Sequence, residues 1–119
     1  MTTLTSFERQ ALECMAPLFG TRAEAFLKQL ASVDVVSREN TGVGFYTRVN
    51  VDRDRHTTLD FAQQSAHFEV DGVDQGVSLI LWGDAEGFLR EIEGVTFGDN
   101  QLADVDLGTL QFRGIGQLS

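Results

Sequence analysis

The amino-acid sequence predicts an α+β domain, with two amino-terminal helices packed on one face of a mostly antiparallel sheet of about five to six strands. Three observations support this fold class. Apolar residues recur at helical spacing up to about residue 31, the period changes to two after Ser32, and glycines stand at the reversals between the later apolar stretches. With 119 residues, of which 42% are hydrophobic, the chain is expected to form a single domain, residues 1–119.

The first helix is expected at about residues 5–16. Thr5 and Glu8 have the spacing of a capping box, in which each side chain bonds the backbone N–H of the other residue. Pro17 lacks an amide hydrogen and its ring clashes with the preceding turn, so this helix should end or kink near Ala16.

The second helix is expected to begin near Thr21 and to run to about Ala31. Thr21 and Glu24 repeat the spacing of a capping box. Apolar side chains then fall on one helical face, at Ala23, Phe26, Leu27 and Leu30. Because such a narrow stripe must be buried against another layer, we expect it to lie on the sheet that the following strands form.

The rest of the chain predicts strands, at about 33–38, 44–51, 67–71, 77–82, 88–97 and 107–112. The first two form a hairpin and the next three a meander, because short turns that contain glycine separate them. Strand 77–82 is apolar on both faces and should therefore be central. Its second face carries Ile80 and Trp82, which must be covered by the curl of the sheet, by the loop 52–65 or by another subunit.

Charge is distributed unevenly along the chain, whose net charge is −9. Residues 57–119 contain eleven acidic side chains against only Arg90 and Arg113. Such a surface repels phosphates and anionic lipids, which excludes nucleic acid and membranes as partners and favours a basic protein partner. The acidic residues are Asp60, Glu69, Asp71, Asp74, Asp84, Glu86, Glu91, Glu93, Asp99, Asp104 and Asp106.

Motifs for catalysis, metal binding or cofactor binding are absent from the sequence. It contains no glycine-rich phosphate loop, nucleophile elbow or pair of redox cysteines. His56 and His67 lack a second ligand at zinc spacing, and the acidic loop 98–106 does not match an EF-hand. We therefore assign no catalytic residue, metal or cofactor, and the sequence favours a non-enzymatic protein without deciding the question.

Five residues on the predicted strands are candidates for a binding site: Tyr46, Arg48, Trp82, Glu91 and Glu93. Glu91 and Glu93 share one face beside Leu89 and Val95, where they could share a proton, bind a cation or simply be solvated. Tyr46 and Trp82, with Arg48 nearby, have the composition of an interface hot spot, although packing in the core or under a loop is the alternative interpretation.

A resemblance to a protein family rests on three segments. These are Gly42–Thr47, then Leu79–Trp82, then Gly87–Leu89 with Ile92–Gly94, which together read GxGFYT, LxLW and GFLxxIEG. This pattern resembles that of small uncharacterised bacterial proteins over roughly residues 42–100. The resemblance implies a small antiparallel α+β domain in the bacterial cytoplasm, and it implies no particular chemistry or functional residue.

The leading functional hypothesis is a non-enzymatic, acidic protein-binding module, similar in kind to an inhibitor or immunity protein. One alternative is a small enzyme or ligand-binding domain that uses a cleft between helices and sheet lined by Glu91 and Glu93. Another alternative is a homodimeric structural protein. Cytoplasmic localisation is expected because the amino terminus lacks the apolar core of a signal peptide and the single cysteine, Cys14, cannot form an internal disulfide.

Overall fold

The computed structural model describes residues 3–52, 58–61, 64–97, 102 and 105–118. A helical run at the amino terminus consists of α1 (Ser6–Met15), the 3-10 segment η1 (Ala16–Arg22) and α2 (Ala23–Ala31). The strands are β1 (Asp34–Asn40), β2 (Gly44–Asn50), β3 (Ser65–Asp71), β4 (Val73–Gly83), β5 (Leu89–Thr96) and β6 (Gln111–Leu118), and a 3-10 turn, η2 (Leu107–Thr109), precedes the last of them. The predicted α+β class is confirmed.

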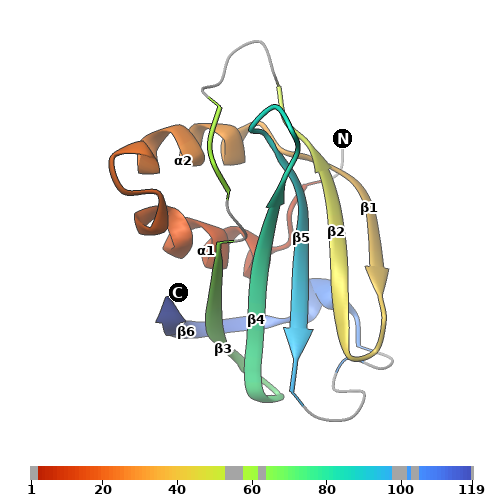
Figure 1. The fold of residues 1–119 in the computed structure, drawn as a ribbon. Helices are drawn as coiled ribbons and strands as arrows, with labels where there is room; N and C mark the ends of the chain where they lie inside the picture. Colours follow the sequence, from red (N-terminus) through yellow and green to blue (C-terminus); the bar gives the residue numbers. More distant parts are fainter. Residues whose placement is uncertain (1–2, 53–57, 62–63, 98–101, 103–104, 119) are drawn as a thin grey trace.

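The described strands form one six-stranded sheet in the order β1-β2-β5-β4-β3-β6, and every neighbouring pair is antiparallel. The β1–β2 hairpin, the β3–β4–β5 meander and the internal position of β4 agree with the sequence analysis. Figure 1 shows β1, β2, β5, β4 and β3 side by side, with β6 crossing behind them and the helical run against a single face of the sheet. The other face is therefore left without a helical layer in the described part of the chain.

The first helix begins as the sequence predicts. The Thr5 hydroxyl accepts a hydrogen bond from the Glu8 N–H (3.1 Å), and a Glu8 carboxylate oxygen accepts one from the Thr5 N–H (2.8 Å), which completes the capping box. As predicted, the α-helix ends near Ala16, which is its C-cap, but the chain stays helical beyond Pro17. It tightens into η1, and the two predicted helices form one run in pieces that is kinked at Gly20, whose φ is 57°.

The second predicted capping box is wrong. The N-cap of α2 is Arg22 rather than Thr21, and no side chain caps it. The Ala23 N–H already bonds the Gly20 carbonyl, because η1 leads directly into α2. An N-terminus that continues a preceding helical turn has fewer free N–H groups for a threonine to cap than an isolated helix has.

Two strands, β4 and β6, differ most from the prediction. The β3–β4 connection is a tight turn at Gly72 (φ 80°), so β4 starts at Val73, and the positive φ of Gly76 (71°) accompanies a shift in the β3–β4 register. The predicted strand 107–112 is displaced toward the carboxyl terminus. Residues 107–109 instead form η2, whose N-cap Asp106 accepts a hydrogen bond from the Gly108 N–H (2.9 Å).

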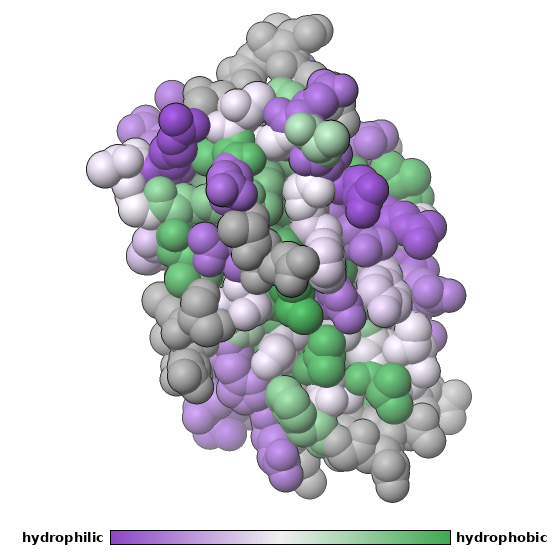
Figure 2. All heavy atoms as spheres, viewed as in Figure 1, coloured by the Kyte–Doolittle hydropathy of each residue, from purple (hydrophilic) through white to green (hydrophobic). Residues whose placement is uncertain are grey.

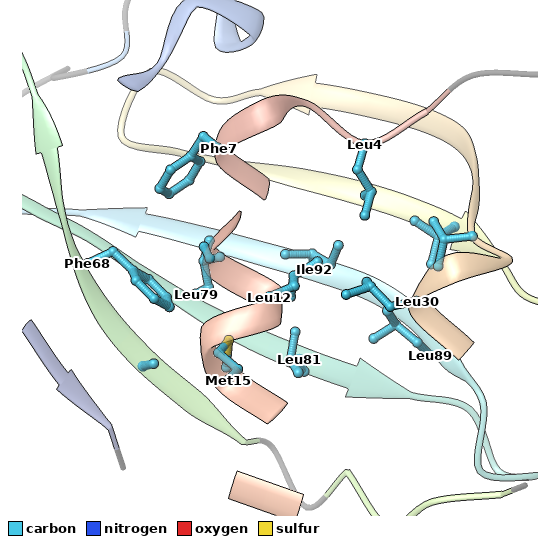
Figure 3. Close-up of a cluster of buried hydrophobic side chains, with 14 of the residues drawn as sticks. Leu4, Phe7, Leu12, Met15, Leu30, Phe68, Leu79, Leu81, Leu89 and Ile92 are labelled. Atoms are coloured by element: carbon cyan, nitrogen blue, oxygen red, sulfur yellow. The ribbon is translucent and has the colours of Figure 1, made fainter. Parts of the chain in front are cut away.

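The core fills the space between the helical run and the inner face of the sheet. Figure 3 shows side chains of α1 and α2 pointing toward those of β3, β4 and β5. The fully buried members include Phe7, Leu12, Met15, Phe26, Phe68, Leu79, Leu81, Leu89 and Ile92. On β4 the residues Val77, Leu79 and Leu81 face this core, so Ser78, Ile80 and Trp82 must face the opposite side.

Two polar side chains of the helices are buried in this core and reach the sheet. Glu8 is 2% exposed, accepts a hydrogen bond from Arg38 Nη2 on β1 (2.6 Å) and another from the Thr47 hydroxyl on β2. Gln29 of α2 is fully buried, donates to the Gly87 carbonyl (3.1 Å) and accepts from the Leu89 N–H (3.1 Å). These contacts attach each helix to a different part of the sheet.

Replacing Glu8 should lower the stability of the fold strongly. Glu8→Ala leaves the partly buried Arg38 without its counter-charge and removes one of the two hydrogen bonds of the capping box, so we expect the free energy of unfolding to fall by about 3 kcal/mol or more. Urea denaturation followed by circular dichroism measures this loss. The control is Glu24→Ala on α2, an exposed partner of Lys28, where a change within about 0.5 kcal/mol is expected. Equal losses would contradict the structural role of Glu8.

Replacing Gly94 should also destabilise the protein, through overpacking. The ring of Phe45 lies over this glycine, and a Cβ at residue 94 would stand 2.2 Å from a ring carbon. We expect Gly94→Ala to cost about 1–3 kcal/mol in the free energy of unfolding. Gly114→Ala is the control, because nothing lies within 4 Å of a Cβ there. A Gly94 variant as stable as the Gly114 variant would show that Phe45 does not occupy this position.

Candidate functional site

We define the open face as the side of the sheet that is turned away from the helical run. It carries the outward-pointing residues of the four middle strands. They are Tyr46, Arg48 and Asn50 of β2, Glu91, Glu93 and Val95 of β5, Ser78, Ile80 and Trp82 of β4, and Ser65, His67 and Glu69 of β3. All five predicted binding residues lie on this face, on adjacent strands. Figure 2, in the view of Figure 1, shows apolar side chains gathered toward the lower half of the sheet and hydrophilic ones along the β1 and β2 side.

Strand register places the five predicted residues in two adjacent rows. Glu91 stands between Arg48 and Trp82 in one row, and Glu93 stands between Tyr46 and Ile80 in the next. Cross-strand neighbours on one face have Cβ atoms about 4.5–5.5 Å apart, which is contact distance for long side chains. The open face therefore brings both aromatic residues, both glutamates and Arg48 together.

The two glutamates have different partners. Glu91 accepts a charged hydrogen bond from Arg48 Nε (3.1 Å), while Glu93 accepts a neutral one from the Trp82 indole N–H (3.0 Å). Both carboxylates are half-buried against their neighbours. Each glutamate has its own donor, so the arrangement gives no support to a proton shared between them. In the described part of the chain, no group of acidic, histidine or cysteine side chains is arranged to hold a metal ion.

Leu89 does not lie beside the glutamates, which corrects the sequence analysis. It is 2% exposed and belongs to the core. Trp82 and Gly83 are consecutive on β4, but their partners on β5 are Glu91 and Leu89, which are two residues apart. Arg90 is therefore an extra, unpaired residue that forms a bulge in β5. Such a bulge reverses the side-chain alternation on one side of it. The apolar neighbours of the glutamates are Val95, as predicted, and Ile80.

The predicted cleft between helices and sheet does not contain Glu91 or Glu93, because both side chains point away from the helices. A depression of about 470 Å³ lies at the end of the sheet, between residues 58–61 and the β4–β5 turn. Trp82 forms part of its wall, and neither glutamate lines it. The enzyme hypothesis in its original form therefore lacks the geometry on which it depended.

His67 has a partner that the sequence analysis did not identify. Its Nδ1 lies 2.9 Å from the Ser78 hydroxyl on the neighbouring strand, and its ring contacts Phe97 with centroids 5.6 Å apart. In the catalytic triad pattern, a third residue orients the imidazole of the serine–histidine pair. No carboxylate among the described residues bonds His67, so we interpret the pair as a cross-strand contact. The other histidine, His56, lies outside the described residues.

The acidic side chains of the second half are at the surface wherever the structure describes them. Asp60, Glu69, Asp71, Glu86 and Asp106 are exposed, and Asp84, Glu91 and Glu93 are half-buried. Asp71 is paired with Arg113 (3.2 Å). Asp99 and Asp104 lie outside the described residues, as does the side chain of Asp74. The described helices include none with the length and apolar character needed to cross a bilayer.

Comparison with known proteins adds no family and no fold relative: neither a protein-family model, nor a curated protein, nor a solved structure matches the chain. The resemblance to small bacterial proteins inferred from the sequence stays a prediction. The geometry and charge of the open face are therefore the basis for assigning a function.

The bond between Trp82 and Glu93 can be tested by fluorescence, because Trp82 is the only tryptophan in the chain. Glu93→Ala removes the acceptor of the indole N–H, so we expect emission at longer wavelength and lower emission anisotropy as the ring meets water and moves more freely. Glu91→Ala, two residues away on the same strand, leaves the acceptor in place and should change both quantities less. Equal changes in the two variants would mean that Glu93 does not hold the indole.

Proposed function

We propose that the protein is a non-enzymatic binding module that docks a basic protein partner on the open face of its sheet, in the manner of an inhibitor or immunity protein. The observation that carries this proposal is the convergence of Tyr46, Trp82, Arg48 and two glutamates on a sheet face that no described helix covers. Tyrosine, tryptophan and arginine are the residues that dominate the energetics of protein interfaces.

Charge supports a basic partner. The net charge is −9, and the acidic side chains of the second half are exposed or half-buried wherever they are described. Such a field accelerates the encounter with a positively charged surface and disfavours wrong partners. It also disfavours a homodimer through this face, because two copies would each bring the same net negative charge.

The central strands supply the rigidity that a binding surface needs. β4 and β5 each pair on both sides, and their inner residues Leu79, Leu81 and Ile92 are fully buried. Side chains on such strands are positioned before the partner arrives, so less conformational entropy is lost on binding. The chain has a single cysteine and suits a reducing compartment, so we propose that it acts in the cytoplasm.

Affinity capture with a matched pair of charge variants tests the proposal. The open-face variant carries Glu69→Lys and Glu93→Lys, and the control carries Glu13→Lys and Glu24→Lys on exposed positions of the helices. Each pair changes the net charge from −9 to −5. From a lysate of the cells that make the protein, we expect the wild type and the control to retain the same basic protein at low salt, and the open-face variant to lose it.

The retained protein is identified by mass spectrometry and rebound in purified form, with salt as a second variable. Affinity should fall as ionic strength rises, because exposed charges are screened beyond about 8 Å at physiological salt. The proposal is wrong if both double variants retain the partner equally, since binding would then lie elsewhere. Light scattering of the free protein distinguishes a second copy of the chain, which would show as a mass that grows with concentration.

A further inference from the structure

The negative charge of the open face is not shared equally by Glu91 and Glu93. Glu91 is neutralised within the chain by Arg48, whose side chain is 66% exposed and crosses to it from β2. The donor to Glu93 is the indole of Trp82, which carries no formal charge. Of the two glutamates, Glu93 is therefore the one whose charge remains uncompensated by the described residues.

Glu93 also lies between the only tyrosine and the only tryptophan of the chain. Tyr46 is its direct cross-strand neighbour on β2, while Trp82 reaches it diagonally from β4 through the indole N–H. Neither ring contacts another aromatic ring in the described part of the chain. Next to a half-buried carboxylate that is flanked by two aromatic rings, a cation is attracted both by the charge of the carboxylate and by the negative faces of the rings.

We propose that Glu93, Tyr46 and Trp82 form a receptor for one arginine side chain of the basic partner. This inference rests on the proposed function and specifies the chemistry of its central contact. The guanidinium group bonds the Glu93 oxygen that the indole leaves open, and its plane lies against the aromatic rings. Arginine fits better than lysine because its guanidinium is planar, weakly hydrated and able to stack while it donates to a carboxylate.

Neighbouring residues explain why the cation binds at Glu93 rather than at Glu91. Arg48 is already paired with Glu91, so a second guanidinium group beside Glu91 would be repelled by the positive charge of Arg48. Beside Glu93 the next residue of the row is Ile80, which is half-buried and apolar. An apolar neighbour excludes water from one side of the carboxylate and strengthens its attraction for a cation.

Titration with a defined peptide tests the receptor without the natural partner. The probe is acetyl-Gly-Arg-Gly-amide, added at constant ionic strength while Trp82 emission and backbone amide NMR shifts are recorded. We expect a saturable change with a dissociation constant on the order of 1 mM. The citrulline peptide has the same shape without the charge and should not bind, and the lysine peptide should bind several-fold more weakly.

Two isosteric variants provide the matched comparison. Glu93→Gln should weaken binding of the arginine peptide about tenfold, whereas Glu91→Gln, which makes the same change of charge on the same face, should alter it less than about twofold. Circular dichroism and urea denaturation establish that both variants are folded. Equal weakening would overturn the proposal, because only the overall charge would then matter. Equal binding of the citrulline or lysine peptide would overturn the assignment to arginine.

The outcome separates this proposal from the one on which it rests. If the arginine peptide does not bind while the open-face capture identifies a partner, the receptor is wrong and the binding module stands. If the peptide binds through Glu93 while no basic protein is captured, the receptor stands and the macromolecular partner is wrong.

Discussion

The buried carboxylate of Glu8 connects the first helix to two strands of the sheet. It caps α1 through the Thr5 N–H, and it binds Arg38 of β1 and Thr47 of β2. A carboxylate that is 2% exposed must have such partners, because an uncompensated buried charge would cost several kcal/mol. The start of α1 is thereby joined to β1 and β2, while the same helix packs against β3 and β6.

This attachment determines which face of the sheet is covered. Thr47 can reach Glu8 only if the odd-numbered residues of β2 point inward, so Tyr46 and Arg48 must point outward. Residues that pair directly across two strands point to the same face of the sheet. Thr47 pairs with Ile92 of β5, so Ile92 is buried, and Glu91 and Glu93 face away from the helices. The composition of the open face thus follows from the contact that holds α1 on the other side.

Local patterns predicted much of this architecture, and long-range contacts account for what they missed. The first capping box and the alternation along β2 depend on a few consecutive residues, and both appear in the structure. The capping box at Thr21 fails because the preceding 3-10 turn continues into α2, and Leu89 turns inward because Arg90 forms a bulge. The contact of Glu8 with Arg38 spans 30 positions, and no local pattern indicates it.

The candidate site likewise depends on contacts between residues that are distant in the sequence. From the sequence, Glu91 and Glu93 are equivalent: both are glutamates on one face of one strand. Their difference arises from the neighbouring strands, since the register puts Arg48 opposite Glu91 and Tyr46 opposite Glu93. Sheet order supplies those neighbours, and β2 and β5 are separated in the sequence by two other strands. The charge of a carboxylate that is paired with an arginine of the same chain is largely neutralised, whereas a carboxylate bonded to an indole keeps its charge available to a partner.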